Sequence, residues 1–277
     1  MSKTTLFVVN PIAGGIDKSS VTSKINSWGK SSHHTVKTWE TTGEDDINKL
    51  KSEVDKLQPD QVVAIGGDGT LMLCAIALKD SDLPLGLIPA GSANGMASEL
   101  EIPENVNEAL QIIEEGHFMN ADMLCFNNEH YGLHISDIGL NANLVKNFEE
   151  SGRRGFLGYA GGIISELVNL EAFKVRLKLD EREIEETCYM VAFANARRYG
   201  TGALLNYLGK MDDGLFEVCI LRKFDITGIA GQFLDILDEE SEHLEVIQGK
   251  ELFLEAEEAR SFQIDGELQP DTARLHV

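Results

Sequence analysis

Residues 62–71 read VVAIGGDGTL, and no other stretch of the chain indicates the class of fold so directly. The apolar run Val62–Ile65 is typical of a buried strand, and it stops at two glycines. Asp68 then stands between glycines, ahead of a helix-like segment. A buried strand that leads through glycines into a helix is typical of sheets with parallel strands. The carboxylate at this junction indicates either a simple turn or a ligand site.

The same alternation of strand and helix extends over residues 1–122. Strands are predicted at 5–10, 34–40, 61–67 and 83–91. Helices are predicted at 19–30, 44–57, 71–80, 93–100 and 104–116, the first capped by Ser19 or Ser20. We therefore expect an N-terminal α/β domain with a mostly parallel sheet. In such sheets ligands bind beyond the carboxyl ends of the strands.

After Asp122 the pattern changes to segments that alternate with period two, as half-exposed strands do. A hairpin is predicted over 123–139, with its turn near Asn127. Helices are expected at 153–170 and 225–240. Residues 123–277 are therefore predicted to form a mainly antiparallel β domain, in the form of a sandwich.

The composition excludes several classes of function. The chain of 277 residues carries 46 acids and 24 bases, a net charge of −22. Binding of nucleic acid and polybasic docking on anionic membranes both need a basic surface, so this acidic composition argues against both. No signal peptide and no apolar run long enough to span a bilayer is apparent. Four scattered cysteines favour a reducing compartment, so we expect a cytoplasmic protein with buried thiols.

Four strand-to-helix junctions in the first domain have an unusual composition. They read NPIAGG (10–15), ETTGEDD (40–46), GGDGT (66–70) and PAGSANGMA (89–97). Glycines allow the backbone to approach a ligand, and main-chain amides at helix N-termini bind anions. Further donors come from Thr41, Thr70, Ser92 and Asn94. Four such loops on one edge of a sheet suit a polyphosphate better than four unrelated tight turns.

A carboxylate beside phosphates is repulsive unless a cation lies between them, which gives Asp68 a role with Mg²⁺. We expect this residue in a surface loop that contributes little to stability. The Walker pattern and the H-R-D set of protein kinases are both absent.

Taken together, these motifs resemble the diacylglycerol kinase catalytic-domain family, which includes bacterial lipid kinases and sphingosine kinases. The resemblance covers nearly the whole chain. It is carried by GGDGTL, by PAGSANGMA about twenty residues later, by NPIAG and by IDGE at 264–267. It implies a first domain similar to those of NAD kinases and phosphofructokinases, followed by a β-sandwich. It also implies ATP and Mg²⁺ as cofactors and phosphorylation of a diacylglycerol-like or sphingoid lipid.

The resemblance also assigns roles to residues. It implies Asp265 as general base and Asp68 as the second catalytic residue. The nucleotide would be bound by Asn10, Pro11, Gly14, Thr41, Gly66, Gly67, Gly69, Thr70, Ser92, Asn94 and Glu267. Metal would be bound by Asp68 and, in a second loop, by the Asp213 carboxylate with the carbonyls of Lys210 and Leu215. On spacing alone, Asp265 and Asp213 each also fit a simple turn.

Some features of the sequence depart from the family pattern. Gly15 stands where the family often has a basic residue, and Gly95 where many bacterial relatives have Asp. An NAD kinase, or a nucleotide-binding regulator with weak catalysis, is the alternative. We expect a lipid substrate, transient contact with a membrane surface and no nucleic acid. The sequence leaves a homodimer open.

Overall fold

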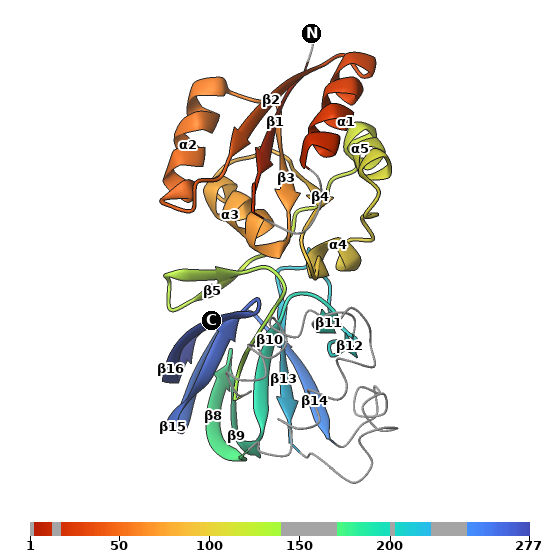
Figure 1. Ribbon diagram of the computed structural model, residues 1–277. Coiled ribbons are helices and arrows are strands. Elements are labelled where there is room, and N and C mark those ends of the chain that lie inside the picture. The colour runs from red at the N-terminus through yellow and green to blue at the C-terminus, as the bar shows by residue number, and fades with distance from the viewer. Residues whose placement is uncertain (1–2, 13–17, 140–170, 200–202, 223–242) are drawn as a thin grey trace. The chain divides into compact units, whose positions relative to one another are not determined.

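The computed structural model in Figure 1 describes residues 3–12, 18–139, 171–199, 203–222 and 243–277. The chain divides into two compact units, Met1–Met119 and Asn120–Val277. The division falls just before Asp122, where the sequence pattern changes. The helices expected at 153–170 and 225–240 lie outside the described residues, as do Gly14 and Gly15.

The first unit contains a parallel sheet with the strand order β2-β1-β3-β4. Its strands are β1 (Lys3–Val9), β2 (His34–Glu40), β3 (Gln61–Gly66) and β4 (Leu85–Pro89). Every residue of β3 is buried, as expected for a strand covered on both faces. The chain goes from β1 out to β2 and then returns past β1 to β3. The adjacent carboxyl ends of β1 and β3 therefore form the point at which the strand order reverses, where α/β sheets bind ligands.

The described part of the first unit also contains five helices (Figure 1). They are α1 (Lys18–Ser31), α2 (Asp46–Leu57), α3 (Asp68–Leu78), α4 (Gly95–Glu99) and α5 (Val106–Glu115). Phe7 and Val9 pack with α1 and α5, whereas α2 and α3 pack together on the other face. The Ser19 or Ser20 cap was wrong, because α1 already includes Lys18 and both serines lie inside the helix.

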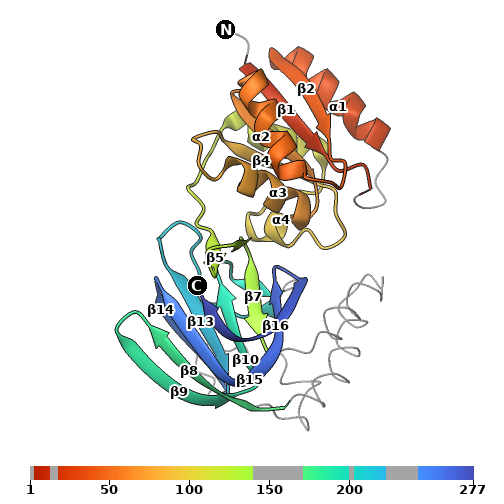
Figure 2. The ribbon, with the colours of Figure 1, turned by 90° about the vertical axis from the view of Figure 1, so that its left-hand side faces the viewer.

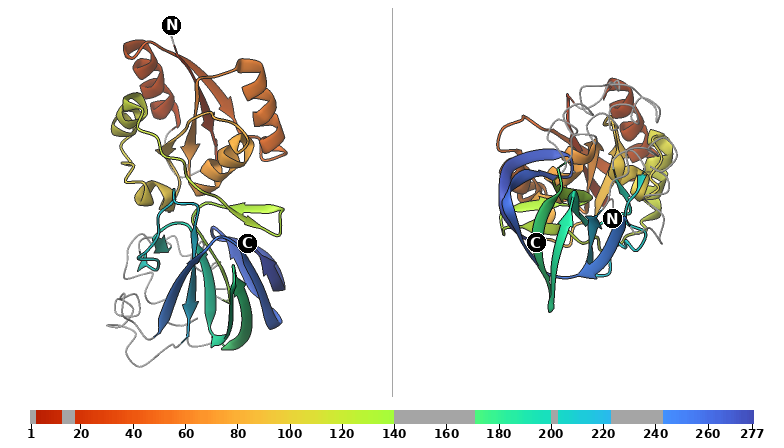
Figure 3. Two further views of the ribbon diagram at one scale, coloured as in Figure 1. Left: turned by 180° about the vertical axis from the view of Figure 1, so that it is seen from behind. Right: turned by 90° about the horizontal axis from the view of Figure 1, so that it is seen from below.

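The second unit contains a large sheet with the order β14-β13-β10-β7-β15-β8-β9, and β16 pairs with β15. The sheet is antiparallel and curls on itself (Figures 2 and 3). Its strands are β7 (Ile135–Ile138), β8 (Phe173–Leu179), β9 (Arg182–Cys188), β10 (Met190–Ala194), β13 (Phe216–Leu221), β14 (Leu244–Gly249), β15 (Leu252–Ile264) and β16 (Glu267–His276). The small pairs β5 (Leu124–Phe126) with β6 (His130–Gly132) and β11 (Arg198–Tyr199) with β12 (Ala203–Leu204) lie apart from it in pairing.

The prediction of an α/β domain followed by an antiparallel β domain is thus confirmed. The hairpin turn predicted near Asn127 is also found, with Asn127 and Asn128 at positive φ between β5 and β6. β8 alternates buried and exposed residues along its whole length, and its buried side joins a core that includes Phe126 and Phe193.

All four cysteines are free, and Cys74, Cys188 and Cys219 are buried. Burial raises the pKa of Cys74 to about 12, so that thiol stays protonated near neutral pH. Among the described residues, no helix has both the length and the apolar character needed to cross a bilayer.

Candidate functional site

Two of the predicted strand-end loops touch backbone to backbone at Gly67 and Gly91. A Cβ atom on Gly91 would lie 2.4 Å from the Cα of Gly67, closer than real Cβ atoms approach. A Cβ atom on Gly66 would lie 2.2 Å from the Oγ1 of Thr70. Gly67 has a φ of −96°, which any residue can adopt, so close approach explains the glycine there. These glycines therefore bring the GGDGT and PAGSANG loops into contact.

Asp68 connects the same two loops through its carboxylate. Its oxygens accept hydrogen bonds from the main-chain amides of Gly95 and Met96, both at 2.9 Å. These amides belong to the first two residues of α4. The Asp68 carboxylate therefore caps the N-terminus of a different helix from the one to which Asp68 belongs. Asp68 is half-buried and is the first residue of α3. The expectation of a surface loop was wrong, because Asp68 belongs to α3 and both of its carboxylate oxygens hold the neighbouring loop.

This arrangement still fits a role with Mg²⁺. Each carboxylate oxygen has two lone pairs, and one amide occupies only one of them. Among the described residues there is no group of three or more His, Cys, Asp or Glu side chains able to hold a metal ion. A Mg²⁺ ion here would therefore depend on Asp68 together with phosphate oxygens, a common arrangement in nucleotide sites.

Asn10 links the loop after β1 to the loop after β3. Its Nδ2 donates to the Oγ1 of Thr70 at 3.3 Å, and its main-chain amide donates to the carbonyl of Ile65 at 3.2 Å. Its Oδ1 accepts from the amide of Ile12 at 3.1 Å. Thr70 is buried, whereas Pro11 is exposed. The structure thus brings Asn10 and Thr70 together, in agreement with the prediction that their loops lie at the same edge of the sheet.

Asn94 is turned into its own loop. Its Oδ1 accepts from the amide of Gly91 at 2.9 Å and its Nδ2 donates to the Gly91 carbonyl at 3.2 Å. The residue is buried and has a φ of 51°, a conformation that Asn tolerates better than most residues. Nearby Ser92 is exposed. In this structure Asn94 shapes the loop, and its predicted contact with nucleotide stays a prediction.

The loop after β2 is held by a residue that the sequence interpretation missed. Asp46 is buried, and its carboxylate accepts from the Thr42 amide and hydroxyl and from the Gly43 amide, at 2.7 to 3.1 Å. Burial pushes its pKa upward, but these hydrogen bonds outweigh burial and lower the pKa below its usual value. The predicted nucleotide residue Thr41 donates its amide to the carbonyl of Val9 at 2.9 Å, which joins this loop to β1.

The described parts of the four loops thus lie at the carboxyl ends of the four strands, and part of that edge can receive an anion. No side chain caps the N-terminus of α3, and Gly69 in its first turn is exposed. Uncapped amides at a helix N-terminus, with the helix dipole behind them, attract phosphate groups.

In the second unit, Asp265 occupies the turn between β15 and β16. Asp265 has a φ of 49° and Gly266 a φ of 91°, as in the two-residue hairpin turns that favour Asp-Gly. Its Oδ2 accepts from the amide of Leu133 at 2.7 Å, and its Oδ1 accepts from the amide of His134 at 3.0 Å. The simple-turn interpretation is therefore correct for the backbone. It does not exclude a functional role, because the carboxylate is held in a fixed orientation. Glu267, the next acid, is exposed at the start of β16.

The predicted metal loop is organised around two aspartates. The Asp213 Oδ1 accepts from the amide of Leu215 at 3.0 Å. Asp122 accepts from the amide of Gly214 through its Oδ2 at 2.7 Å, and donates its own amide to the Met211 carbonyl at 2.6 Å. Asp213 and Lys210 are exposed, and metal binding by them stays a prediction.

A buried acid lies behind this loop. Glu217 is inaccessible to solvent, and its oxygens accept from the Asn206 side chain and, at 2.8 Å, from Gln248. Burial raises the pKa of Glu217 above its usual value, and the nearby Asp213 adds to this effect. The period-two pattern of β13 predicted a half-exposed strand, with Glu217 on the side opposite Val218. That prediction was wrong, because every residue of β13 is buried, and the burial of Glu217 was therefore missed.

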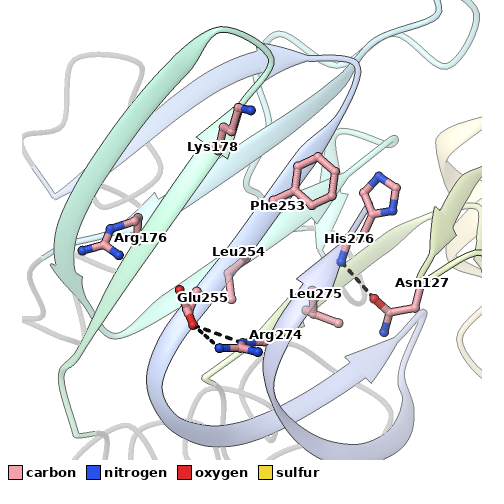
Figure 4. A pocket seen from close by; sticks show the side chains of 9 residues that line it. All are labelled: Asn127, Arg176, Lys178, Phe253, Leu254, Glu255, Arg274, Leu275 and His276. Atoms are coloured by element: carbon pink, nitrogen blue, oxygen red, sulfur yellow. Dashed lines mark hydrogen bonds and ion pairs between the residues drawn. The ribbon is translucent and has the colours of Figure 1, made fainter.

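A groove of about 380 Å³ lies on the exposed face of β8, β15 and β16 (Figure 4). It is lined by Asn127, Arg176, Lys178, Phe253, Leu254, Glu255, Arg274, Leu275 and His276. Arg274 pairs with Glu255 inside the groove. Arg176 pairs with Glu185 and His276 with Glu251. None of the described site residues lines the groove, and both of its arginines already have carboxylate partners.

Comparison with known proteins agrees with this architecture. Residues 4–126 match the diacylglycerol kinase catalytic domain, and residues 136–276 match the YegS C-terminal NAD kinase beta sandwich-like domain. A probable lipid kinase YegS-like protein of Chromohalobacter salexigens is 28% identical over 83% of this chain and 76% of that protein. Another, from Pectobacterium atrosepticum, is 27% identical over 98% of this chain and 90% of that protein.

Solved structures show the same fold. A diacylglycerol kinase from Bacillus anthracis superposes with a TM-score of 0.76 at 23% identity, over 99% of this chain and 93% of that one. A second structure from the same organism gives a TM-score of 0.82 at 26% identity, with the same coverage.

The two matching family models and the glycine-rich strand-end loops place the chain in a class of proteins that includes lipid kinases. The chain belongs to the diacylglycerol kinase catalytic domain family and carries a YegS-type C-terminal domain.

Proposed function

We propose that this protein is an ATP-dependent lipid kinase that transfers the γ-phosphate of ATP to a hydroxyl group of a diacylglycerol-like or sphingoid lipid. The family relationship supports the reaction class, because the relatives compared above are described as lipid or diacylglycerol kinases.

The observation that carries the proposal is the orientation of the Asp265 carboxylate. Two main-chain amides hold its two oxygens, at 2.7 and 3.0 Å. A carboxylate oxygen has two lone pairs, so a hydrogen bond from one amide does not by itself prevent it from accepting a proton. A general base contributes only when it is positioned within hydrogen-bond reach of the proton it removes. The Leu133 and His134 amides fix the orientation of the Asp265 carboxylate, which supports this role.

In the proposed reaction the lipid oxygen forms a bond to the γ-phosphorus of ATP, and the bond between that phosphorus and the ADP oxygen breaks. Asp265 takes the proton of the hydroxyl group. The uncapped α3 N-terminus and the contacting loops at Gly67 and Gly91 hold the phosphates. Mg²⁺ bound through Asp68 would neutralise charge on the phosphate oxygens.

A transfer assay with labelled phosphate tests this proposal. The full chain is incubated with Mg²⁺, ATP labelled at the γ-phosphate, and separate acceptors: diacylglycerol, monoacylglycerol and sphingosine in mixed micelles, and soluble NAD. We expect label in the lipid phase with one acceptor class, and its loss in the Asp265→Asn variant. Label in NAD would instead support the NAD kinase alternative. ATP binding without transfer to any acceptor would support the regulator.

A further inference from the structure

Asn195 is a fully buried residue directly after β10, and it holds two distant segments of the second unit. Its Nδ2 donates to the carbonyl of Leu133 at 3.0 Å and to the carbonyl of Asp122 at 2.8 Å. Its main-chain amide donates to the carbonyl of His134 at 3.0 Å. None of the motifs discussed above includes this residue.

The first of these bonds acts on the peptide group that orients Asp265. The carbonyl of Leu133 and the amide of His134 belong to one peptide unit. Asn195 donates to the carbonyl oxygen of that peptide unit. The N–H of the same unit, which is the His134 amide, donates to the Oδ1 of Asp265 at 3.0 Å. A donor on the carbonyl polarises the peptide group and strengthens the bond made by its N–H. The side chain of Asn195 therefore both fixes and polarises one of the two amides that hold the carboxylate.

The second bond reaches the loop predicted to bind metal. Asn195 donates to the main-chain carbonyl of Asp122, and the Asp122 carboxylate accepts from the amide of Gly214 at 2.7 Å. One buried amide group thus connects the Asp265 turn and the 211–215 loop. This second connection passes through main-chain and side-chain bonds of Asp122, so we expect it to be weaker than the first.

We propose that Asn195 is a positioning residue for Asp265, an inference that rests on the proposed role of Asp265 as general base. Asn195 acts by holding the Leu133–His134 peptide group, without contact to substrate. The alternative is that the buried side-chain amide of Asn195 only stabilises the fold. Replacement of a residue that only stabilises the fold lowers the melting temperature. Replacement of a positioning residue also raises the exchange rates of the Leu133 and His134 amides and lowers kcat.

Asn206 provides a matched control in the same unit. It is equally buried, and its Nδ2 donates to the carbonyl of Ala196 at 3.3 Å and to Glu217. None of these bonds reaches the peptide groups that hold Asp265. Asn195→Ser and Asn206→Ser therefore remove similar buried amides, and only the first removes the donor to Leu133.

The experiment compares both variants with the wild type by hydrogen exchange and by kinetics. In Asn195→Ser we expect the Leu133 and His134 amides to exchange roughly fivefold faster than in Asn206→Ser, the factor for one typical hydrogen bond. We expect its kcat to fall by about 10²-fold, the cost of a slightly misplaced catalytic group, with an unchanged KM for ATP. Equal exchange and equal kcat in the two variants would overturn the proposal.

A second measurement covers the case in which Asn195→Ser does not fold. In Asp265→Asn the acceptor for one of the two amides is lost, so the side-chain amide resonance of Asn195 should shift in the NMR spectrum. An unchanged Asn195 resonance beside shifted Leu133 and His134 amides would contradict the coupling. Both amide readouts are independent of activity. Lack of transfer by the wild type would refute the proposed function, whereas equal amide behaviour would refute only this inference.

Discussion

The Oδ2 atom of Asp265 lies 2.7 Å from the main-chain nitrogen of Leu133, a residue 132 positions earlier in the chain. The carboxylate therefore ties the β15–β16 turn to the segment that follows β6. In the first unit Asp68 does the same for two strand-end loops, by binding the amides of Gly95 and Met96. Both aspartates proposed for catalysis are thus also held by main-chain donors, and substitutions at either one need a stability control.

Removal of the Asp68 carboxylate should damage both fold and activity. Asp68→Ala leaves the amides of Gly95 and Met96, both in buried residues, without their acceptor. We expect unfolding to become easier by about 1–3 kcal/mol, the cost of unsatisfied buried donors, and transfer to be lost. Denaturant unfolding and the transfer assay measure these effects. Asp68→Asn keeps one acceptor and should lose less stability, yet equally little activity should remain. Wild-type turnover in either variant would end the metal role of Asp68.

Substitution of Gly91 tests the contact between the two glycine loops. A methyl group there would meet the Cα of Gly67 at 2.4 Å, so Gly91→Ala must push the loops apart. We expect a stability loss of about 1–3 kcal/mol, typical of overpacking, together with weaker ATP binding. Ser92→Ala, at an exposed position of the same loop, should change stability by less than about 0.5 kcal/mol. Equal stability of the two variants would show that the loops are not in contact.

The predicted metal loop can be tested by melting curves with and without Mg²⁺. An ion that binds only the folded protein raises its stability in proportion to RT ln(1 + [L]/Kd), so the melting temperature should rise with Mg²⁺ in the absence of nucleotide. Asp213→Asn should abolish that rise, whereas Asp212→Asn at the exposed neighbouring position should retain it. A rise that survives in Asp213→Asn would exclude the loop as the source of the effect.

The buried Asp46 should make stability depend on pH. Its hydrogen bonds to Thr42 and Gly43 lower its pKa in the folded protein, so it stabilises the fold above its unfolded pKa of about 3.9. This contribution is lost as the pH falls through the lowered folded value. We expect Asp46→Asn to unfold more easily at pH 7, by about 1–2 kcal/mol, and the difference from wild type to shrink near pH 3. A difference that grows on acidification would contradict the assignment.

The sequence predicted those parts of the structure that depend on local patterns. Strand and helix alternation predicted the first unit, and the shared edge of parallel strands correctly placed Asn10 and Thr70 together. The hydrogen-bond donors to the carboxylates could not be predicted, because nearly every residue has a main-chain amide and the sequence does not show which ones lie close to a carboxylate. For that reason the capping of α4 by Asp68 was missed, although the helix itself was predicted, and the Asp46 hydrogen bonds were missed as well. Asn94 was read as a donor to ligand, although its amide can equally close its own loop.

The most direct test of the proposed mechanism is the steady-state kinetics of Asp265→Asn. The variant can keep one of the two amide bonds but presents an NH₂ group to the other donor, so its melting temperature must be measured beside kcat and the KM for ATP. Asp271→Asn, at an exposed position in β16, is the control. The account predicts that kcat of Asp265→Asn falls by about 10²–10⁴-fold with nearly unchanged ATP affinity. A variant that loses ATP binding but keeps its turnover at saturating ATP would contradict it.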